Sequence, residues 1–383
     1  MTLLLILSFG GSLQRWRDGG ILSREIELYV EYLRRGMFER VIVFSYGSSD
    51  RDVLRQAGLP ADLTDRFEII GPSQPLHTPL AKLAHSLNPA LLRDAAKRAS
   101  ICKTNQISGS WTALLLRLLG VPMFVRCGYI LSRRHFLNGK HLAGLVSAGL
   151  EGVVFNAARL VSVTTKDAAE RVALFRVMRR NQVFVAPTYV NTELFDSRAG
   201  DKPADETLVY VGRLEPQKNL ANLIEACAMT GSALEIIGTG SLRAELEGLA
   251  RRLAANVSFT TALQNDEIAA LYWKRRYFVL PSLQEGLPKA LIEAMSSEMI
   301  CIGTAIPGTM DLLREGETGY LARGTDPAAI AAAIERARQD PRQVAVARAA
   351  REYVLSQHSL PGYATREFDE IRRAFADLRE TAA

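Results

Sequence analysis

Ser282-Leu-Gln-Glu-Gly-Leu-Pro-Lys-Ala-Leu-Ile-Glu-Ala-Met295 decides the fold, because it joins a strand to a helix around two carboxylates. The apolar run Tyr277–Leu280 before it predicts a buried strand. We expect Glu285 and Gly286 in the turn and Pro288 at the first helical position, where a missing N–H costs nothing. Free N–H groups at such a helix start form an anion site, and the glutamates beside it could hold the hydroxyls of a phosphorylated sugar.

The same pattern has a plainer interpretation, because a glutamate in the first turn of any helix also favours the helix dipole. A second segment, Leu208–Leu220, strengthens the functional interpretation. Its strand ends at Gly212, and Arg213 and Lys218 follow within one loop, with Asn219 placed to cap the next helix. Arg offers a planar fork to phosphate oxygens and Lys a mobile charge, although both are usually solvated surface residues.

A third strand-turn-helix segment lies at Leu234–Leu246. Its strand ends at Gly238 and Gly240, and Ser241 is the expected helix cap. Glycines let a backbone approach a ligand closely, but a single G-x-G can also be no more than a tight turn.

In order and spacing, these three segments resemble the C-terminal half of retaining glycosyltransferases of family 4, which have the GT-B fold. The resemblance rests on V-G-R-L-x-x-x-K from Val211, G-x-G from Gly238, and E-G-L-P from Glu285 with a second glutamate at Glu293. The runs Ile-Cys-Ile-Gly-Thr and Glu-Gly-Glu-Thr-Gly-Tyr-Leu follow in the expected places, so the resemblance covers about residues 206–325.

The resemblance implies that Arg213, Lys218 and Glu285 are the catalytic residues. The two cations would bind the donor diphosphate, Glu285 the hydroxyls of the donor sugar, and Glu293 the ribose. Fixed cations and helix N-termini stabilise the negative charge that grows on the departing diphosphate. The implied donor-binding residues are Gly19, Gly20, Gly212, Gly238, Gly240, Leu263, Gly286, Leu287, Pro288 and Glu293. Such sites generally work without a bound metal, so no metal and no cofactor is expected, and a UDP- or GDP-linked sugar is the substrate.

On the acceptor side, the chain departs from many relatives of that family. They carry a histidine after the strand that here reads Met123–Tyr129, where none is present. Arg126 and Tyr129 are the candidates for acceptor binding in its place, and the nearby His135 is more typical of a surface histidine. Asp50-Arg-Asp52 formally matches the D-x-D metal motif of the other glycosyltransferase fold. Since it follows a strand in the wrong domain, we interpret it as a loop and helix cap.

The length of 383 residues favours two domains rather than one core. Alternating strands and helices predict an α/β fold with two doubly wound Rossmann-like domains, which in the GT-B fold face each other across a cleft. The predicted divisions are an acceptor-binding domain over 1–187, a linker over 188–205, a nucleotide-sugar-binding domain over 206–360, and a C-terminal helix over 361–383 that can pack back on the first domain.

Expected elements of the N-terminal half follow from its apolar runs. Short buried strands are expected at Leu3–Leu7, Val41–Phe44, Phe67–Ile70, Ser100–Lys103, Met123–Arg126, Leu160–Val163 and Val183–Val185. Helices are expected at Ile21–Arg35, Pro89–Ala99, Trp111–Leu119, Phe136–Ala157 and Lys166–Arg176. Phe9–Gly20 is predicted to be a loop, in which Gly19 and Gly20 either resemble the family's glycine pair before its first helix or simply give flexibility.

Charge is divided unequally along the chain. Residues 1–187 hold 25 Lys or Arg and 14 Asp or Glu, a net charge of +11, whereas the remainder has a net charge of −5. No acid occurs between Asp94 and Glu151, where there are eight basic residues. An anionic partner fits this half, such as a membrane surface or a lipid-phosphate acceptor. Nucleic acid would suit the charge, but no motif for it is present, and a merely solubilising basic surface is the alternative.

Other sequence features indicate the cellular compartment in which the protein is expected. The apolar start Met1–Ser8 lacks a basic leader and a cleavage site, so we expect a buried strand rather than a signal peptide. No apolar run is long enough for a transmembrane helix. The scattered Cys102, Cys127, Cys227 and Cys301 predict buried free thiols in a reducing compartment. We expect a cytoplasmic protein, with peripheral contact to the inner face of the cell membrane as an added hypothesis.

The predicted function is transfer of a hexose from a nucleotide-diphosphate sugar to a glycan or lipid-linked acceptor, with retained configuration. Bacterial surface polysaccharide assembly (exopolysaccharide, capsule or lipopolysaccharide) is the expected pathway. Two alternatives stay open at this point: a catalytically silent sugar-nucleotide-binding or scaffold protein, and a GT-B-like sugar-nucleotide epimerase.

Overall fold

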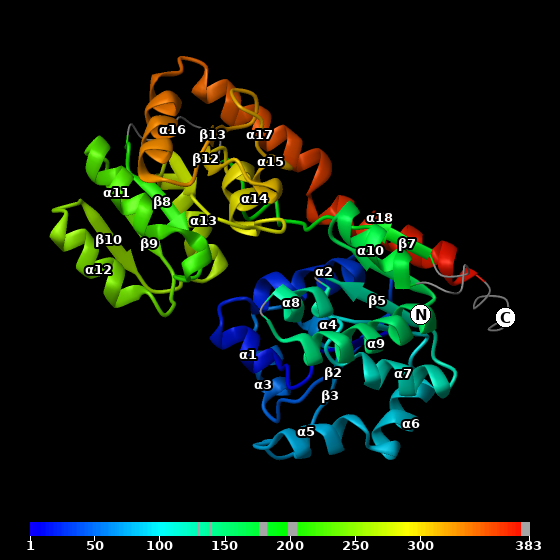
Figure 1. Ribbon diagram of the computed structural model, residues 1–383. Coiled ribbons are helices and arrows are strands. Elements are labelled where there is room, and N and C mark those ends of the chain that lie inside the picture. The colour runs from blue at the N-terminus through cyan, green and yellow to red at the C-terminus, as the bar shows by residue number, and fades with distance from the viewer. Residues whose placement is uncertain (129, 138, 176–181, 198–204, 377–383) are drawn as a thin grey trace. The chain divides into compact units, whose positions relative to one another are not determined.

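The computed structural model describes residues 1–128, 130–137, 139–175, 182–197 and 205–376. The chain divides into two compact units. The first consists of Met1–Pro187 and the C-terminal residues from Ala364, and the second of Thr188–Tyr363. Each unit is built on one parallel sheet whose strands are joined by helices (Figure 1).

The sheet of the first unit has the strand order β3-β2-β1-β4-β5-β6-β7, and all its pairs are parallel. Strand β1, which lies between β2 and β4, is wholly apolar after Thr2, as expected for a parallel strand with both faces covered. The strands are β1 Thr2–Ile6, β2 Arg40–Phe44, β3 Phe67–Ile70, β4 Ile101–Thr104, β5 Met123–Cys127, β6 Leu160–Val163 and β7 Gln182–Val185.

The helices of this unit are α1 Leu13–Asp18, α2 Leu22–Arg34, α3 Asp50–Arg55, α4 Ala61–Thr64, α5 Pro79–Ser86, α6 Pro89–Arg98, α7 Ser110–Leu118, α8 Leu131–Leu137, α9 His141–Ala157 and α10 Lys166–Phe175. Several of these helices begin where a side chain accepts hydrogen bonds from the free N–H groups of the first turn. In α6, for example, Pro89 occupies the first turn and the Asn88 side chain accepts hydrogen bonds from Ala90 and Leu91 N–H.

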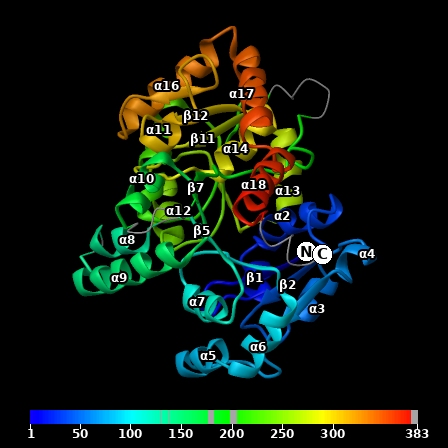
Figure 2. The ribbon, with the colours of Figure 1, turned by 90° about the vertical axis from the view of Figure 1, so that its right-hand side faces the viewer.

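The predicted helix Phe136–Ala157 is confirmed as α9 over His141–Ala157, but Phe136 and Leu137 belong to the separate helix α8, which lies beside α9 (Figures 1 and 2). Gly139, with a left-handed φ of 70°, lies between the two helices, and the buried Glu151 of α9 holds the start of α8. Its Oε1 accepts hydrogen bonds from Leu131 N (2.6 Å) and Ser132 N (3.2 Å), and its Oε2 from Ser132 Oγ (2.5 Å). One helix thus caps the N-terminus of the other, which no local pattern reveals.

The predicted loop Phe9–Gly20 is also wrong in part, because it contains the short helix α1. Asp50 holds the start of that helix, since its carboxylate accepts hydrogen bonds from Leu13 N (2.8 Å) and Gln14 N (3.0 Å). Asp50 therefore caps a helix 36 residues earlier in the chain. Gly19 ends α1, and Gly20 takes a left-handed φ of 66° before α2.

The sheet of the second unit has the order β10-β9-β8-β11-β12-β13 and is again parallel throughout. Its strands are β8 Leu208–Val211, β9 Leu234–Ile237, β10 Val257–Thr260, β11 Tyr277–Leu280, β12 Ile300–Thr304 and β13 Tyr320–Ala322. Its helices are the 3₁₀ turn η1 Pro216–Lys218, α11 Leu220–Thr230, α12 Arg243–Arg252, α13 Asn265–Lys274, α14 Lys289–Ser296, α15 Pro307–Met310, α16 Pro327–Gln339 and α17 Gln343–Gln357.

The prediction of an α/β fold with two doubly wound Rossmann-like domains is confirmed. In chain order, each sheet reads 3-2-1-4-5-6 across its first six strands. The direction of winding therefore reverses between β1 and β4 in the first unit, and between β8 and β11 in the second. Ligands of open α/β sheets bind beyond the carboxyl ends of the strands at such a reversal.

Helix α18, Leu360–Ala374, attaches to the first unit through a buried ion pair. Lys103 of β4 and Glu367 of α18 are both fully buried and paired, and Tyr32 of α2 donates its hydroxyl to the same carboxylate. The Lys103 ammonium lies 5.1 Å from the ring centre of Phe124. Burial lowers the pKa of Lys103, and the charge of Glu367 opposes that shift.

Two further predictions concern side-chain burial and membrane spans. The four cysteines are buried and free, as predicted, and burial raises the pKa of the Cys102 thiol to about 12. In the described part of the chain, no helix has both the length and the apolar content to cross a bilayer.

Candidate functional site

The candidate site lies where the winding of the second sheet reverses. Strands β8 and β11 are direct neighbours, paired at Leu208 with Tyr277 and at Val209 with Phe278. Gly212, Arg213 and Lys218 follow the carboxyl end of β8, and Ser282, Glu285 and Gly286 follow that of β11. Two sequence motifs that are about 70 residues apart along the chain therefore meet at one edge of the sheet.

The two loops at this edge are joined by three contacts. The Lys218 ammonium lies 2.5 Å from Glu285 Oε1. The carbonyl oxygen of Gln217 accepts a hydrogen bond from Leu283 N at 2.9 Å, and Asn219 Nδ2 donates to the carbonyl oxygen of Pro281 at 3.1 Å. Backbone, amide and charged contacts together hold the two predicted catalytic side chains in one place.

Asn219 does not act as the predicted cap. Its backbone is left-handed, with φ of 57°, and its side chain makes no bond to the first turn of α11. The side-chain amide instead donates to the carbonyl oxygens of Pro281 and of Thr325, the second at 2.7 Å. Asparagine tolerates the left-handed region better than most residues, which suits it to this position. The predicted Ser241 cap is wrong as well, because α12 starts after Leu242.

The carboxylate of Glu285 is oriented before any ligand binds. Its Oε1 accepts a hydrogen bond from Ser282 Oγ at 2.7 Å in addition to the Lys218 contact. The carbonyl oxygen of Ser282 in turn accepts from Thr304 Oγ1 at the end of β12. The Glu285 and Lys218 side chains are 10% and 13% exposed, so the pair is shielded but still reachable from solvent.

Beside this pair, Gly286 faces open space. A methyl group added to its Cα would meet no atom within 4 Å. Helix α14 then starts at Lys289 with Pro288 as the residue before it, so Pro288 lies one position earlier than predicted. Glu293 is on α14 and is buried, and Leu287 is half-buried.

Gly238, Gly240 and Gly308 are required by close backbone packing. A methyl group on Gly238 would lie 1.9 Å from the carbonyl oxygen of Gly212, and one on Gly240 would lie 2.4 Å from that of Leu214. Gly238 also has a φ of 148°. A methyl group on Gly308 would lie 2.0 Å from the carbonyl oxygen of Gly286. These glycines let the backbones of the loops pack closely together. The sequence motif alone does not distinguish this role from contact with a ligand.

Tyr210 supports the first loop and was not singled out by sequence reasoning. Its hydroxyl donates to the carbonyl oxygen of Arg213 at 3.0 Å. The same hydroxyl packs against Gly212, where an added methyl group would lie only 2.6 Å from it. Burial raises the pKa of Tyr210, and the negative charge of Glu285 acts in the same direction. The Arg213 side chain itself is exposed at the edge of the sheet. The only available signal was the position of Tyr210 within an otherwise aliphatic strand.

Other predicted site residues lie elsewhere. Leu263 is half-buried against the core of the second unit. Gly19 and Gly20 connect α1 to α2 in the first unit. Arg126 is half-buried on β5, where its backbone N–H donates to Thr104 Oγ1 at 3.3 Å. Tyr129 lies outside the described residues.

His135, the alternative on the acceptor side, has a partner within the α8–α9 hairpin. Its Nδ1 lies 2.9 Å from Ser147 Oγ and 3.2 Å from the carbonyl oxygen of Ala143. Both contacts are to α9, so its position favours a structural role.

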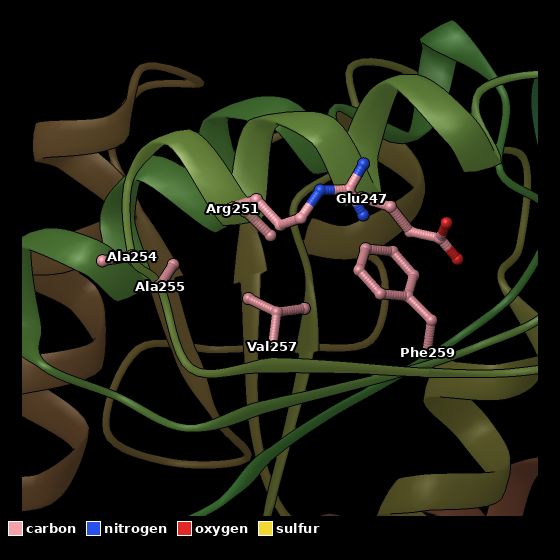
Figure 3. Close-up of a pocket in the computed structure, with 7 residues that line it drawn as sticks. Glu247, Arg251, Ala254, Ala255, Val257 and Phe259 are labelled. Atoms are coloured by element: carbon pink, nitrogen blue, oxygen red, sulfur yellow. The ribbon is translucent and has the colours of Figure 1, made fainter.

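A separate cavity of about 310 Å³ lies between α12 and the edge strand β10 (Figure 3). Arg251 and Glu247 of α12 lie above Val257 and Phe259 of β10 in that view. Strand β10 is two strands away from β8. None of the predicted site residues lines this cavity, so we do not assign the site to it.

Residues 192–353 match the family model of glycosyl transferases group 1. A Campylobacter jejuni protein named GalNAc-alpha-(1->4)-GalNAc-alpha-(1->3)-diNAcBac-PP-undecaprenol alpha-1,4-N-acetyl-D-galactosaminyltransferase is 28% identical over 181 residues, which are 45% of this chain and 49% of that protein. A D-inositol 3-phosphate glycosyltransferase of Acidothermus cellulolyticus is 28% identical over 81% of this chain and 77% of its own length. The chain spans about half of the length of several other curated relatives that it matches.

Solved structures match along nearly the whole chain. HepE of Anabaena in complex with UDP has a TM-score of 0.75 at 16% identity, with 97% of this chain and all of that chain covered. Sucrose-phosphate synthase of Thermosynechococcus elongatus has a TM-score of 0.76 at 20% identity, with 98% of this chain and all of that chain covered. These similarities show the shared GT-B fold.

Proposed function

We propose that this chain, whose C-terminal half matches the group 1 glycosyltransferases, is a retaining, metal-independent hexosyltransferase of family 4 that uses a UDP- or GDP-linked sugar. One observation carries the proposal: the Lys218–Glu285 pair is fixed at the reversal point of the second sheet, beside the open space at Gly286. A group 1 family model also covers this region, and solved structures with the same fold include one in complex with UDP-glucose.

In the proposed site, the cations and the helix start act on the donor diphosphate. Arg213 is exposed and can present its guanidinium fork to phosphate oxygens, while Lys218 supplies a second charge held in place by Glu285. When the bond between the sugar and the diphosphate breaks, negative charge grows on the diphosphate. Groups that are already oriented stabilise that charge without having to reorganise.

Glu285 has two tasks in this proposal. Ser282 and Lys218 occupy one of its oxygens, which leaves Oε2 to accept hydrogen bonds from donor-sugar hydroxyls. Glu293 would reach the ribose, and the N–H groups after Gly286 would face phosphate or sugar. An acceptor hydroxyl would then form the new glycosidic bond on the face that the diphosphate leaves.

The proposed acceptor is a glycan or lipid-linked sugar of bacterial surface polysaccharide assembly. The basic first unit supports this choice, because its net charge suits an anionic membrane surface or lipid phosphate. A relative whose name includes a PP-undecaprenol acceptor supports it independently. Gly19, Gly20 and Arg126 are the first-unit residues proposed to contact donor or acceptor.

Replacing Gly286 with valine tests where the donor lies. A Cβ at this position meets no atom of the free protein within 4 Å, so the unfolding temperature should change little, but a bound sugar nucleotide would lose that space. We expect affinity for the donor to fall by at least about tenfold, equivalent to about 1.4 kcal/mol. Isothermal titration with UDP-glucose and GDP-mannose measures this directly.

Gly248→Val is the matched control, because Gly248 lies on α12 of the same unit with only the end of the Arg252 side chain nearby. It should bind the donor like the unchanged protein. Equal affinity in the Gly286 variant would place the donor elsewhere and contradict the proposed site.

A further inference from the structure

Helix α9 presents two contrasting faces. Gly144, Ser147, Glu151, Val154 and Phe155 are buried and lie on one side of the helix. The opposite side, which we call the α9 apolar face, consists of Leu142, Leu145, Val146, Gly149 and Val153. Their spacing of three, one, three and four residues places them in one stripe along the helix.

The four large side chains of this face are well exposed. The exposed fractions are 77% for Leu142, 64% for Leu145, 68% for Val146 and 58% for Val153. Single exposed aliphatic residues are ordinary, but a contiguous stripe of them is typical of an interaction surface. Helix α9, all of whose residues the structure describes, has Glu151 as its only acid or permanent charge, and that side chain points inward to cap α8.

The charge around this face is positive. Lys140 is exposed directly before α9, and Arg133 of α8 is exposed while it pairs with Asp167 at 2.9 Å. Along the sequence, no acid occurs from residue 95 to residue 150, which includes α8 and most of α9. A protein partner with an apolar patch would not require this excess of cations, whereas an anionic lipid surface attracts both features.

We propose that the α9 apolar face inserts into the interfacial layer of an anionic bilayer, with neighbouring cations against the lipid headgroups. This inference deepens the membrane contact included in the proposed function, and it does not depend on which sugar is transferred. Apolar burial and electrostatic attraction add in such surface helices, so binding should require both anionic lipid and the aliphatic side chains.

Co-sedimentation of the full chain with vesicles tests this proposal. We expect binding to phosphatidylglycerol–phosphatidylethanolamine vesicles, little binding to phosphatidylcholine vesicles, and weaker binding at high salt. The double variant Leu145→Ser and Val146→Ser should reduce the partition coefficient by at least about tenfold, because two aliphatic side chains no longer enter the apolar layer. Both positions are exposed, so its unfolding temperature should be unchanged.

Met229→Ser is the control, since Met229 is 63% exposed on α11 of the second unit and should not contribute. Nucleotide affinity, measured by titration with UDP and GDP in all variants, separates a failure of this surface from a failure of the proposed donor site. The proposal is overturned if the double variant binds vesicles as well as the unchanged chain, or if the unchanged chain does not bind. It is also overturned if light scattering shows a dimer that the double variant abolishes, because a second copy would then cover the face.

Discussion

Replacing Glu285 with alanine is expected to remove most sugar transfer while the second unit stays folded. Ser282 and Lys218 hold the carboxylate through one oxygen, and in the proposed site its other oxygen accepts hydrogen bonds from the donor sugar. Its loss frees Lys218 from its fixed position and removes an acceptor for sugar hydroxyls. Deleting one oriented group of this kind typically lowers kcat by about 10²–10³-fold.

Initial rates with excess donor and acceptor measure this effect, and circular dichroism confirms the fold. Glu285→Gln keeps the shape and the Ser282 contact but not the charge, so it should fall between alanine and the unchanged protein. Glu317→Ala is the matched control, because Glu317 is an exposed glutamate of the same unit whose ion pair with Arg314 is open to solvent at 3.9 Å. Full activity of the Glu285→Ala protein would remove this residue from the reaction.

Replacing Glu367 with alanine is expected to cost about 3–5 kcal/mol of folding free energy. The substitution leaves the fully buried Lys103 without its partner carboxylate, and it removes the acceptor of the Tyr32 hydroxyl. Breaking one side of a buried ion pair is far more destabilising than replacing both sides with apolar residues. Helix α18 should therefore detach from the first unit before the rest of that unit unfolds.

Urea unfolding of the full chain, followed by circular dichroism, measures the loss. The double variant Lys103→Met and Glu367→Leu should recover most of it, because neither residue leaves a buried charge behind. Glu370→Ala, on the same helix but paired with the exposed Arg373, should change the free energy by only about 0.5 kcal/mol. A cost below about 1 kcal/mol for Glu367→Ala would show that the pair does not hold α18.

Much of the fold follows from short-range patterns. Apolar runs predicted the strands at both site loops, and Lys218 and Glu285 follow shortly after the ends of these strands. The strand-turn-helix order was enough to place both motifs at carboxyl ends of parallel strands.

The missed features share one cause, which is that each depends on a partner far away in the chain. Asn219 is well suited to cap a helix, but Pro281 and Thr325 take its amide instead. Glu151 caps α8 from 20 residues further along the chain, and Asp50 caps α1 rather than its own helix. Local propensity cannot choose among such partners, because tertiary contacts outweigh it.

Thermal unfolding with UDP, GDP and ADP, each with and without EDTA, tests the central claim most directly. The claim is that a nucleotide diphosphate binds without metal beside Arg213 and the Lys218–Glu285 pair. One nucleotide at 100 times its Kd should stabilise the protein by about 2.7 kcal/mol, with no effect of EDTA. The rise should shrink in Arg213→Ala and in Lys218→Ala. No rise with any nucleotide, a rise that EDTA abolishes, or an equal rise in both variants would contradict it.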